Sequence, residues 1–281
     1  MSFRALPMAL LCCLVCLISC QKEISLDDSN GNNNNNNNTN NNNPACNNTV
    51  MKMKKWAATF DAEHYIESTW NSDGTIKTVK INVPFSEYRT ASYNYENGRI
   101  KEAVLHNNLD NEVYDTAIFH YDGNGKVDSM YLKNDSYFSF KLNYANGKLV
   151  KFIRYADSQM MYYWDIETDA KDNLVKAVEW WPGTSGLEKE STYTFSRDDR
   201  KNPFAGLAPY LFYLDNDYPI FRFWGPNNYV DQRYIDHTGS GVDLTTGYKF
   251  KYNSNCYPAS TQMTIQGGVL FTTDDFIYTY Y

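Results

Sequence analysis

Phe119-His-Tyr-Asp-Gly-Asn-Gly125-Lys-Val127 is the fullest copy of a short unit that recurs along the chain and decides its fold. The other clear copies are Trp70-Asn-Ser-Asp-Gly74-Thr-Ile76, Tyr93-Asn-Tyr-Glu-Asn-Gly98-Arg-Ile100 and Leu142-Asn-Tyr-Ala-Asn-Gly147-Lys-Leu149. The alternating aromatic residues belong on one face of a strand, because successive side chains of a strand point to opposite faces. The Asn-Gly pairs suit a tight turn with positive φ angles, and an apolar residue after each turn begins a returning strand. Each unit therefore predicts a β-hairpin.

Hairpins that follow one another predict an all-β fold. Weaker copies occur at residues 164–174, 193–203 and 248–258, while residues 203–247 interrupt the rhythm and are expected to pack over one face or edge of the sheet. We expect a single domain at residues 50–281, built as an extended, twisted antiparallel meander of consecutive β-hairpins. A β-sandwich and a partly closed barrel are the alternatives, because the order of the hairpins does not say whether the sheet stays open.

The composition indicates a folded, acidic protein. Aromatic residues make up 16% of the 281 residues, with 24 tyrosines, which is too many for a disordered chain and ample for a core. The formal net charge is -7, and Lys and Arg are scattered rather than clustered. A nucleic-acid binder carries a basic patch, so we expect no nucleic-acid partner.

The first residues predict export and lipid anchoring. Residues 1–19 have the basic start, the apolar run and the small final residue of a signal peptide, and the run is shorter than the ~20 residues that span a bilayer. The order Leu17-Ile18-Ser19-Cys20 resembles the lipobox of bacterial lipoproteins, which implies cleavage before Cys20 and lipid on its thiol. By resemblance to lipoprotein sorting rules, Gln21 favours the outer membrane, with the protein either facing the periplasm or exposed on the surface.

Residues 20–49 are dominated by asparagine and have too few apolar residues to form a core, so we expect a flexible tether between the lipidated Cys20 and the domain. Cys46 and Cys256 are the cysteines that remain after the signal peptide and Cys20 are set aside. In an oxidising compartment they could form a disulfide, and two unpaired thiols are the alternative. No Cys or His spacing supports a metal site, and no cofactor is expected.

The repeat unit, with aromatic-x-Tyr-Asp-x-x-Gly-Arg/Lys-Ile/Val/Leu as its fullest form, resembles the YD repeats of RHS-type proteins. The order of the parts resembles that of uncharacterised Bacteroidota outer-membrane or surface lipoproteins: lipobox, Asn-rich tether, hairpins, Asp199-Arg-Lys-Asn202-Pro203-Phe204, Asn227-Asn228, Tyr257-Pro258 and a Tyr-rich terminal strand. This resemblance implies a long, curved antiparallel sheet on a membrane anchor. It supplies no catalytic residue.

A search for catalytic motifs finds no HExxH, GxSxG, P-loop or Rossmann fingerprint, so no catalytic residue is predicted. The favoured interpretation is a non-enzymatic, lipid-anchored envelope protein that serves as a surface binding or interaction module. A hydrolase acting on glycan or peptidoglycan is one alternative, with Asp165, Glu167 and Glu179 as its candidate carboxylates. A purely structural or assembly partner of an outer-membrane complex is the other.

Three tryptophans are candidate ligand contacts. Trp180 and Trp181 are adjacent on a predicted strand and face opposite sides, so one of them is expected to be exposed unless both faces are covered. Trp224 lies in a predicted turn. The expected partners are the membrane, through the lipid, and a glycan or an envelope protein.

Overall fold

The computed structural model describes residues 46, 49–59, 65–82, 89–107, 110–135, 138–211, 224–267 and 270–281. These residues belong to a compact unit that runs from Ala45 to Tyr281. The predicted signal peptide at 1–19, Cys20 and nearly all of the tether predicted at 20–49 lie outside the described residues.

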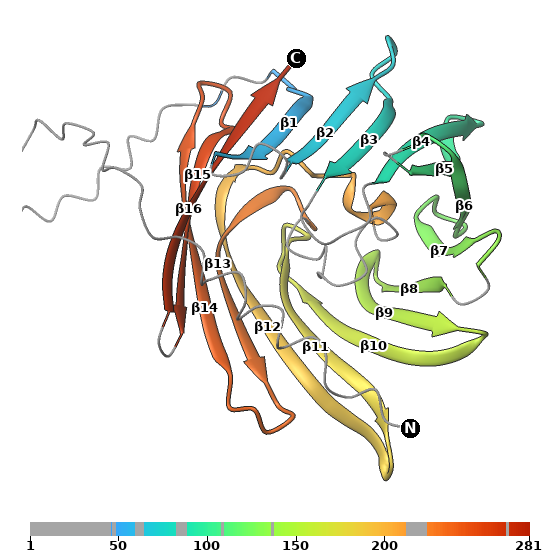
Figure 1. The fold of residues 1–281 in the computed structure, drawn as a ribbon, viewed down its shortest axis with the longest axis vertical. Helices are drawn as coiled ribbons and strands as arrows, with labels where there is room; N and C mark the ends of the chain where they lie inside the picture. The colour runs from blue at the N-terminus through green and yellow to red at the C-terminus, as the bar shows by residue number, and fades with distance from the viewer. Residues whose placement is uncertain are drawn as a thin grey trace, which may run out of the picture. The chain divides into compact units, whose positions relative to one another are not determined.

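The described residues form sixteen β-strands, each antiparallel to the next in the chain (Figure 1). The strands are β1 (Met53–Ala58), β2 (Tyr65–Trp70), β3 (Ile76–Asn82), β4 (Arg89–Glu96), β5 (Arg99–Asn107), β6 (Val113–Tyr121), β7 (Val127–Leu132), β8 (Ser139–Ala145), β9 (Lys148–Ala156), β10 (Gln159–Thr168), β11 (Leu174–Gly183), β12 (Gly186–Lys201), β13 (Asn227–Asp236), β14 (Asp243–Tyr252), β15 (Pro258–Gly267) and β16 (Leu270–Tyr280). The all-β class and the antiparallel meander of hairpins are confirmed.

The sheet closes into a barrel, because β1 pairs with β16. In this pair Trp56 lies opposite Tyr278 and Ala58 lies opposite Phe276. The expectation of an extended, open sheet is therefore wrong, and so is the sandwich alternative. Of the three predicted arrangements, the partly closed barrel is the one most similar to the observed closed barrel. Closure is favourable because an open meander leaves the hydrogen-bonding groups of its first and last strands unpaired, and closure satisfies both edges.

The turns have the geometry that their sequences predict. Glu96 pairs with Arg99 across a two-residue loop in which Asn97 and Gly98 have φ angles of 52° and 75°. Asn146 and Gly147 repeat this geometry with 52° and 76°. Two successive positive φ angles define the type I′ turn, whose twist matches that of the strands it joins.

The two faces of the barrel wall have different chemistry. In β8, Phe140 and Leu142 are buried on the inner face, while Lys141 between them is exposed. On the outer face Lys151 of β9 forms an ion pair of 3.0 Å with Asp165 of β10. In these strands the apolar residues of the period-two pattern therefore point into the barrel, and the charged residues Lys141, Lys151 and Asp165 point out of it.

A plug segment, residues 202–211, leaves β12 and packs inside the barrel. Its apolar side chains are almost fully buried: Phe204, Leu207, Ala208 and Leu211. The ring of Tyr210 lies edge-on to Phe119 of β6, with 5.4 Å between the centroids, and the Tyr93 hydroxyl donates a 3.2 Å hydrogen bond to the Tyr210 carbonyl. Residues 203–247 are expected to cover one face or edge of the sheet. Residues 203–211 do cover a face, the inner one, but the expectation is wrong for residues 227–236 and 243–247, which form strands of the wall.

The plug segment contains the only helix of the described residues, the 3-10 turn Ala208–Tyr210. Within the part of the chain that the structure describes, no helix has the length and apolar content needed to cross a membrane.

Candidate functional site

The tyrosine of each repeat joins its hairpin to the preceding one. Its hydroxyl donates to the carbonyl of the residue that begins the returning strand of the previous hairpin. These bonds join Tyr95 to Ile76 (2.8 Å), Tyr121 to Ile100 (2.5 Å) and Tyr144 to Val127 (2.9 Å). Burial raises the pKa values of Tyr95, Tyr121 and Tyr144, so these hydroxyls stay protonated and keep donating. The repeat motif therefore has a structural role in the wall.

A row of cations lies at the same end of the barrel, over the rings of successive hairpins. The Arg99 guanidinium lies 5.4 Å from the centre of the Tyr121 ring, and the Lys126 ammonium lies 5.1 Å from that of Tyr144. Both cations directly follow a turn glycine in the repeat. Lys52, which precedes β1, takes a similar position 5.7 Å from the centre of the Trp70 ring. Each such contact contributes roughly 0.5–1 kcal/mol at exposed sites.

The cations differ in what their N–H groups do. Lys126 donates a hydrogen bond to the Gly147 carbonyl, and Lys148 donates to the Asp169 carbonyl. Among the described residues, neither the Arg99 guanidinium nor the Lys52 ammonium donates a hydrogen bond; each has its ring contact instead. Two members of the row therefore keep their donors available.

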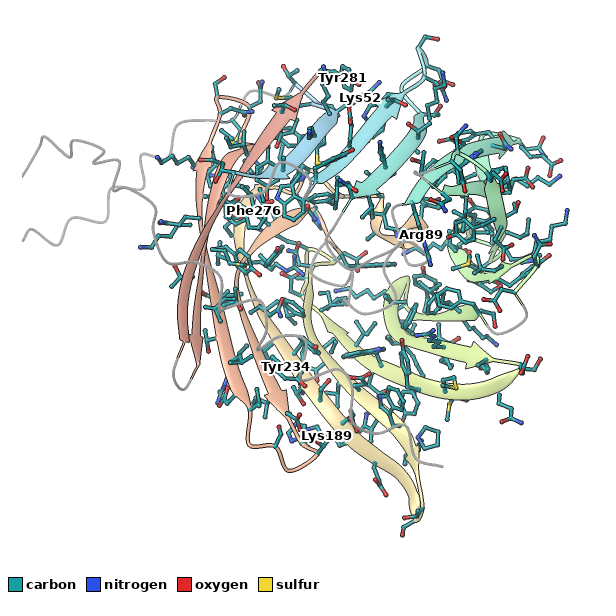
Figure 2. All side chains as sticks on the ribbon, in the orientation of Figure 1. Lys52, Arg89, Lys189, Tyr234, Phe276 and Tyr281 are labelled. Carbon is teal, nitrogen blue, oxygen red and sulfur yellow. A yellow bond between two sulfur atoms is a disulfide. The ribbon has the colours of Figure 1, made fainter. Side chains whose placement is uncertain are left out.

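These two cations line two hollows that share Trp70 as a wall. The Arg99 hollow, of about 250 Å³, lies between the barrel wall and the plug segment, and its lining includes Trp70, Tyr95, Arg99, Tyr121, Leu207 and Tyr210. The Lys52 hollow, of about 260 Å³, is lined by Lys52, Thr69, Trp70, Asn71 and Tyr281. Figure 2 shows Lys52 and Tyr281 close together, far from Lys189 at the opposite end of the long strands.

Each hollow contains one cation, and no acidic side chain of the described residues lines either of them. The Trp70 indole is held in place, because its N–H donates a 2.9 Å hydrogen bond to the Met53 carbonyl. The nearby Asp73 carboxylate accepts hydrogen bonds from the amide and the hydroxyl of Thr75, which lower its pKa and hold it within the turn. The hollows therefore offer positive charge and aromatic surface.

The motifs of the lipoprotein resemblance meet at one polar junction, where the plug segment leaves the wall. The Asn202 amide donates to the Gly225 carbonyl (2.9 Å), and the Asn228 amide donates to the Lys201 carbonyl (2.9 Å). The Lys201 amide donates to the Cys256 carbonyl (3.1 Å). All of these groups are used within the junction, which anchors the plug segment.

The structure also joins Cys46 to Cys256 by a disulfide, with 5.4 Å between the Cα atoms of two cysteines that are 210 positions apart in the chain. The Arg200 guanidinium lies 2.8 Å from the Cys256 sulfur. The covalent link therefore ties the first described residue of the unit to the polar junction.

The three predicted tryptophans do not come together. Trp181 lies on the inner face, stacked on Tyr162 with 5.0 Å between ring centroids, and is 37% exposed. Trp180 lies on the outer face, where it stacks on Tyr163. Trp224 packs against the core. The three rings therefore form no common platform.

The candidate carboxylates of the hydrolase alternative are also separated. Asp165 and Glu167 lie on the outer face, where they form ion pairs with Lys151 and Lys176. Glu179 lies on the inner face, where it accepts hydrogen bonds from the Trp181 indole (2.8 Å) and the Ser191 hydroxyl (2.7 Å), and burial raises its pKa. The barrel wall therefore separates Glu179 from Asp165 and Glu167. Among the described residues no group of three His, Cys, Asp or Glu side chains could hold a metal ion.

Sequence reasoning missed Lys52, Trp70, Arg99 and Tyr210. A signal for Arg99 was present, since a basic residue follows the turn glycine in three of the four clear repeats. Trp70 stands where the other clear copies begin with a smaller ring or leucine. Nothing local indicates Tyr210, because its place depends on the plug segment entering the barrel.

The fold is similar to that of solved structures from Bacteroides. A porin-like protein from Bacteroides uniformis is 12% identical, with a TM-score of 0.51, over 83% of this chain and 98% of that one. A porin-like protein from Bacteroides vulgatus is 10% identical, with a TM-score of 0.40, over 83% and 99%. The Photorhabdus luminescens Tc holotoxin pore matches with a TM-score of 0.28, over 75% of this chain and 14% of that one.

At these identities only the likeness to the Bacteroides uniformis protein bears on the fold. No protein-family model matches the chain, and no curated protein does either. The resemblances to YD repeats and to bacterial lipoproteins therefore stay predictions. The chain is a sixteen-stranded, antiparallel meander barrel whose fold is similar to that of a Bacteroides porin-like protein.

Proposed function

We propose that the protein is a non-enzymatic, lipid-anchored envelope protein that serves as a binding module, and that its barrel stands outside the bilayer. The lipid on Cys20 would hold it at the outer membrane. The barrel would carry the binding surface. The observation that supports this proposal most is the distribution of charge between the two faces of the wall.

A barrel that crosses a membrane has an apolar outer band and a polar interior. This barrel has the reverse arrangement: the Lys151–Asp165 and Lys176–Glu167 ion pairs lie side by side on the outer face of β9, β10 and β11. A Lys side chain facing lipid at the bilayer midplane costs about 2–4 kcal/mol. The charged outer face therefore favours a barrel surrounded by water.

The side chains inside the barrel also favour a barrel surrounded by water. Buried apolar side chains line it, and the plug segment fills part of it with Phe204, Leu207 and Leu211. Among the described residues the inner face is therefore mainly apolar, with exceptions such as Glu179 and the half-buried Tyr229 and Tyr248. The wall separates Glu179 from Asp165 and Glu167, and each of these two outer carboxylates is held in an ion pair with a lysine, so the structure adds no support for the hydrolase alternative.

The test is to export the full chain behind an ordinary cleavable leader with Cys20→Ala and to compare it with the lipidated protein. Membranes are washed with carbonate, and the protein is then partitioned between detergent and water. We expect the lipidated protein in the membrane and detergent fractions and the variant in the aqueous fraction, with the same circular dichroism spectrum. A variant that stays in the washed membranes would contradict the proposal, and channel conductance in planar bilayers would support the porin-like alternative.

The membrane side is tested by protease treatment of intact cells. Surface exposure predicts cleavage of the lipidated protein without lysis, with a periplasmic enzyme as the protected control. Protection until the outer membrane is opened would place the module on the periplasmic side, where it would remain a binding module.

A further inference from the structure

We propose that the Arg99 and Lys52 hollows form one binding site for an acidic saccharide, with a sugar ring in each hollow and Trp70 between them. This inference rests on the proposed function and gives its ligand a chemical class. The site lies at the end of the barrel where the repeat turns gather. It uses residues from the wall and from the plug segment.

The charge of the ligand follows from the two cations. Arg99 and Lys52 donate no hydrogen bond within the described part of the chain, whereas Lys126 of the same row, and Lys148 after the next turn glycine, donate to carbonyls. The two hollows that these cations line contain no carboxylate of the described residues. A guanidinium and an ammonium with available donors favour anionic groups, and the guanidinium suits a carboxylate in particular.

The sugar character follows from the rings and their oxygens. Trp70 and Tyr121 offer aromatic surface of the kind on which the C–H face of a sugar can lie. The Tyr95 and Tyr121 hydroxyls donate to the Ile76 and Ile100 carbonyls, so their oxygens can still accept hydrogen bonds from ligand hydroxyls. Aromatic surface, acceptors and cations together match a polyhydroxylated ring that carries a carboxylate.

The size of the site agrees with two rings. The hollows measure about 250 and 260 Å³, each a little below the range of about 300–1,000 Å³ that is usual for sites of drug-sized ligands, as a subsite for a single ring would be. Tyr210 and Leu207 of the plug segment form one side of the Arg99 hollow. The site is therefore complete only when the plug segment is in place.

The net charge of -7 affects how such a site can attract an acidic ligand. At low ionic strength the whole chain repels an acidic ligand, so the attraction must come from the local cations. Binding is therefore expected to depend on Arg99 and Lys52 individually.

The test is isothermal titration calorimetry on the mature, lipidated protein in non-ionic detergent. The probes are digalacturonate, the neutral digalactose of the same linkage and sodium sulfate, at matched ionic strength. We expect saturable binding of digalacturonate, weaker binding of digalactose and no comparable binding of sulfate. Arg99→Gln and Lys52→Gln should each weaken digalacturonate binding about tenfold or more, since each removes a charge-assisted contact.

Lys126→Gln is the matched control, because Lys126 belongs to the same row and also lies over a tyrosine ring but lines neither hollow. Its affinity for digalacturonate should stay within about twofold of the parent. Equal affinity for digalactose, or for sulfate, would overturn the acidic saccharide. Absence of all binding would overturn it as well, and would leave the carbonate-wash result, which tests the proposed function, unaffected.

Discussion

The barrel has two halves that are stabilised in different ways. Strands β2 to β9 have six to nine residues and form the repeat half, whereas β10 to β16 have ten to sixteen and form the long-strand half. In the repeat half Tyr95, Tyr121 and Tyr144 each bond to the previous hairpin, and inner residues such as Leu105 and Ala117 are fully buried. In β13 and β14 of the long-strand half, the inner side chains Tyr229, Tyr248 and Phe250 are only half-buried.

The plug segment accounts for much of this difference. Its Tyr210 packs on Phe119 and Tyr93, which belong to the repeat half. The long-strand half has stacked rings, such as Phe250 on Tyr252 at 5.7 Å, and the disulfide at Cys256, together with one hydroxyl bond of the repeat type, from Tyr280 to the Pro258 carbonyl (2.7 Å). The interior is therefore filled unevenly: β13 and β14 are packed less tightly than the repeat half, and also less tightly than β11, where Leu174 and Ala177 are fully buried.

The difference in packing between the two halves is tested most directly by truncating an inner leucine to alanine in each half. Leu105→Ala should lower the free energy of unfolding by about 2–5 kcal/mol, because it opens a cavity in a fully buried site. Leu244→Ala, at a half-buried inner position of β14, should cost about 1 kcal/mol. Urea titration of the full chain, followed by circular dichroism, measures both. Equal losses would show that the two halves are packed alike.

Removal of the disulfide should weaken the molecule almost as much. Cys46→Ser together with Cys256→Ser frees a loop of 210 residues, and such losses are typically about 2–4 kcal/mol. The comparison predicts that amide exchange then rises in β13 to β16 more than in β2 to β9. Hydrogen exchange with mass spectrometry of the oxidised parent and the variant measures this directly. A uniform rise would mean that the junction supports both halves equally.

The repeat tyrosines should have smaller, individual effects. Tyr121→Phe removes the bond to the Ile100 carbonyl and should cost about 0.5–1.5 kcal/mol. Tyr131→Phe, at a more exposed ring that stacks on His120, is the matched control and should change the free energy of unfolding little. Thermal unfolding of the three proteins makes the comparison. If the control lost as much stability, the hydroxyl bonds between hairpins would not be what stabilises the repeat half.

The smallest effect concerns pH and the opposite pKa shifts of two carboxylates, one in each half. Burial raises the pKa of Glu179 in the long-strand half, whereas hydrogen bonds lower the pKa of Asp73 in the repeat half. A raised carboxyl pKa means that the folded state binds the proton more tightly, so ionisation of Glu179 opposes folding above its folded pKa. Glu179→Gln should therefore be slightly more stable than the parent at neutral pH, and the gain should shrink as the pH falls through that pKa. Urea titrations across this pH window measure the gain, and an unchanged gain at acidic pH would contradict it.

How much of the fold was predictable depends on distance along the chain. The hairpins at Gly98 and Gly147 depend on local sequence, because an Asn-Gly pair between strand-forming residues favours a tight turn by itself. Both turns form as predicted. The period-two pattern also says which residues share a face. It does not say how curvature accumulates over many strands, so the pairing of Trp56 with Tyr278 could not be foreseen.

The candidate site shows the same limit. The sequence by itself determined the strand order, the turns and the basic residue after the turn glycines, because each of these depends on neighbours within one hairpin. Only the tertiary structure decided that the barrel closes, that Leu207 and Tyr210 enter it, and that Arg99 and Lys52 come to line hollows on either side of Trp70. Those features depend on contacts between residues more than 100 positions apart, such as Tyr93 and Tyr210, which no local pattern encodes.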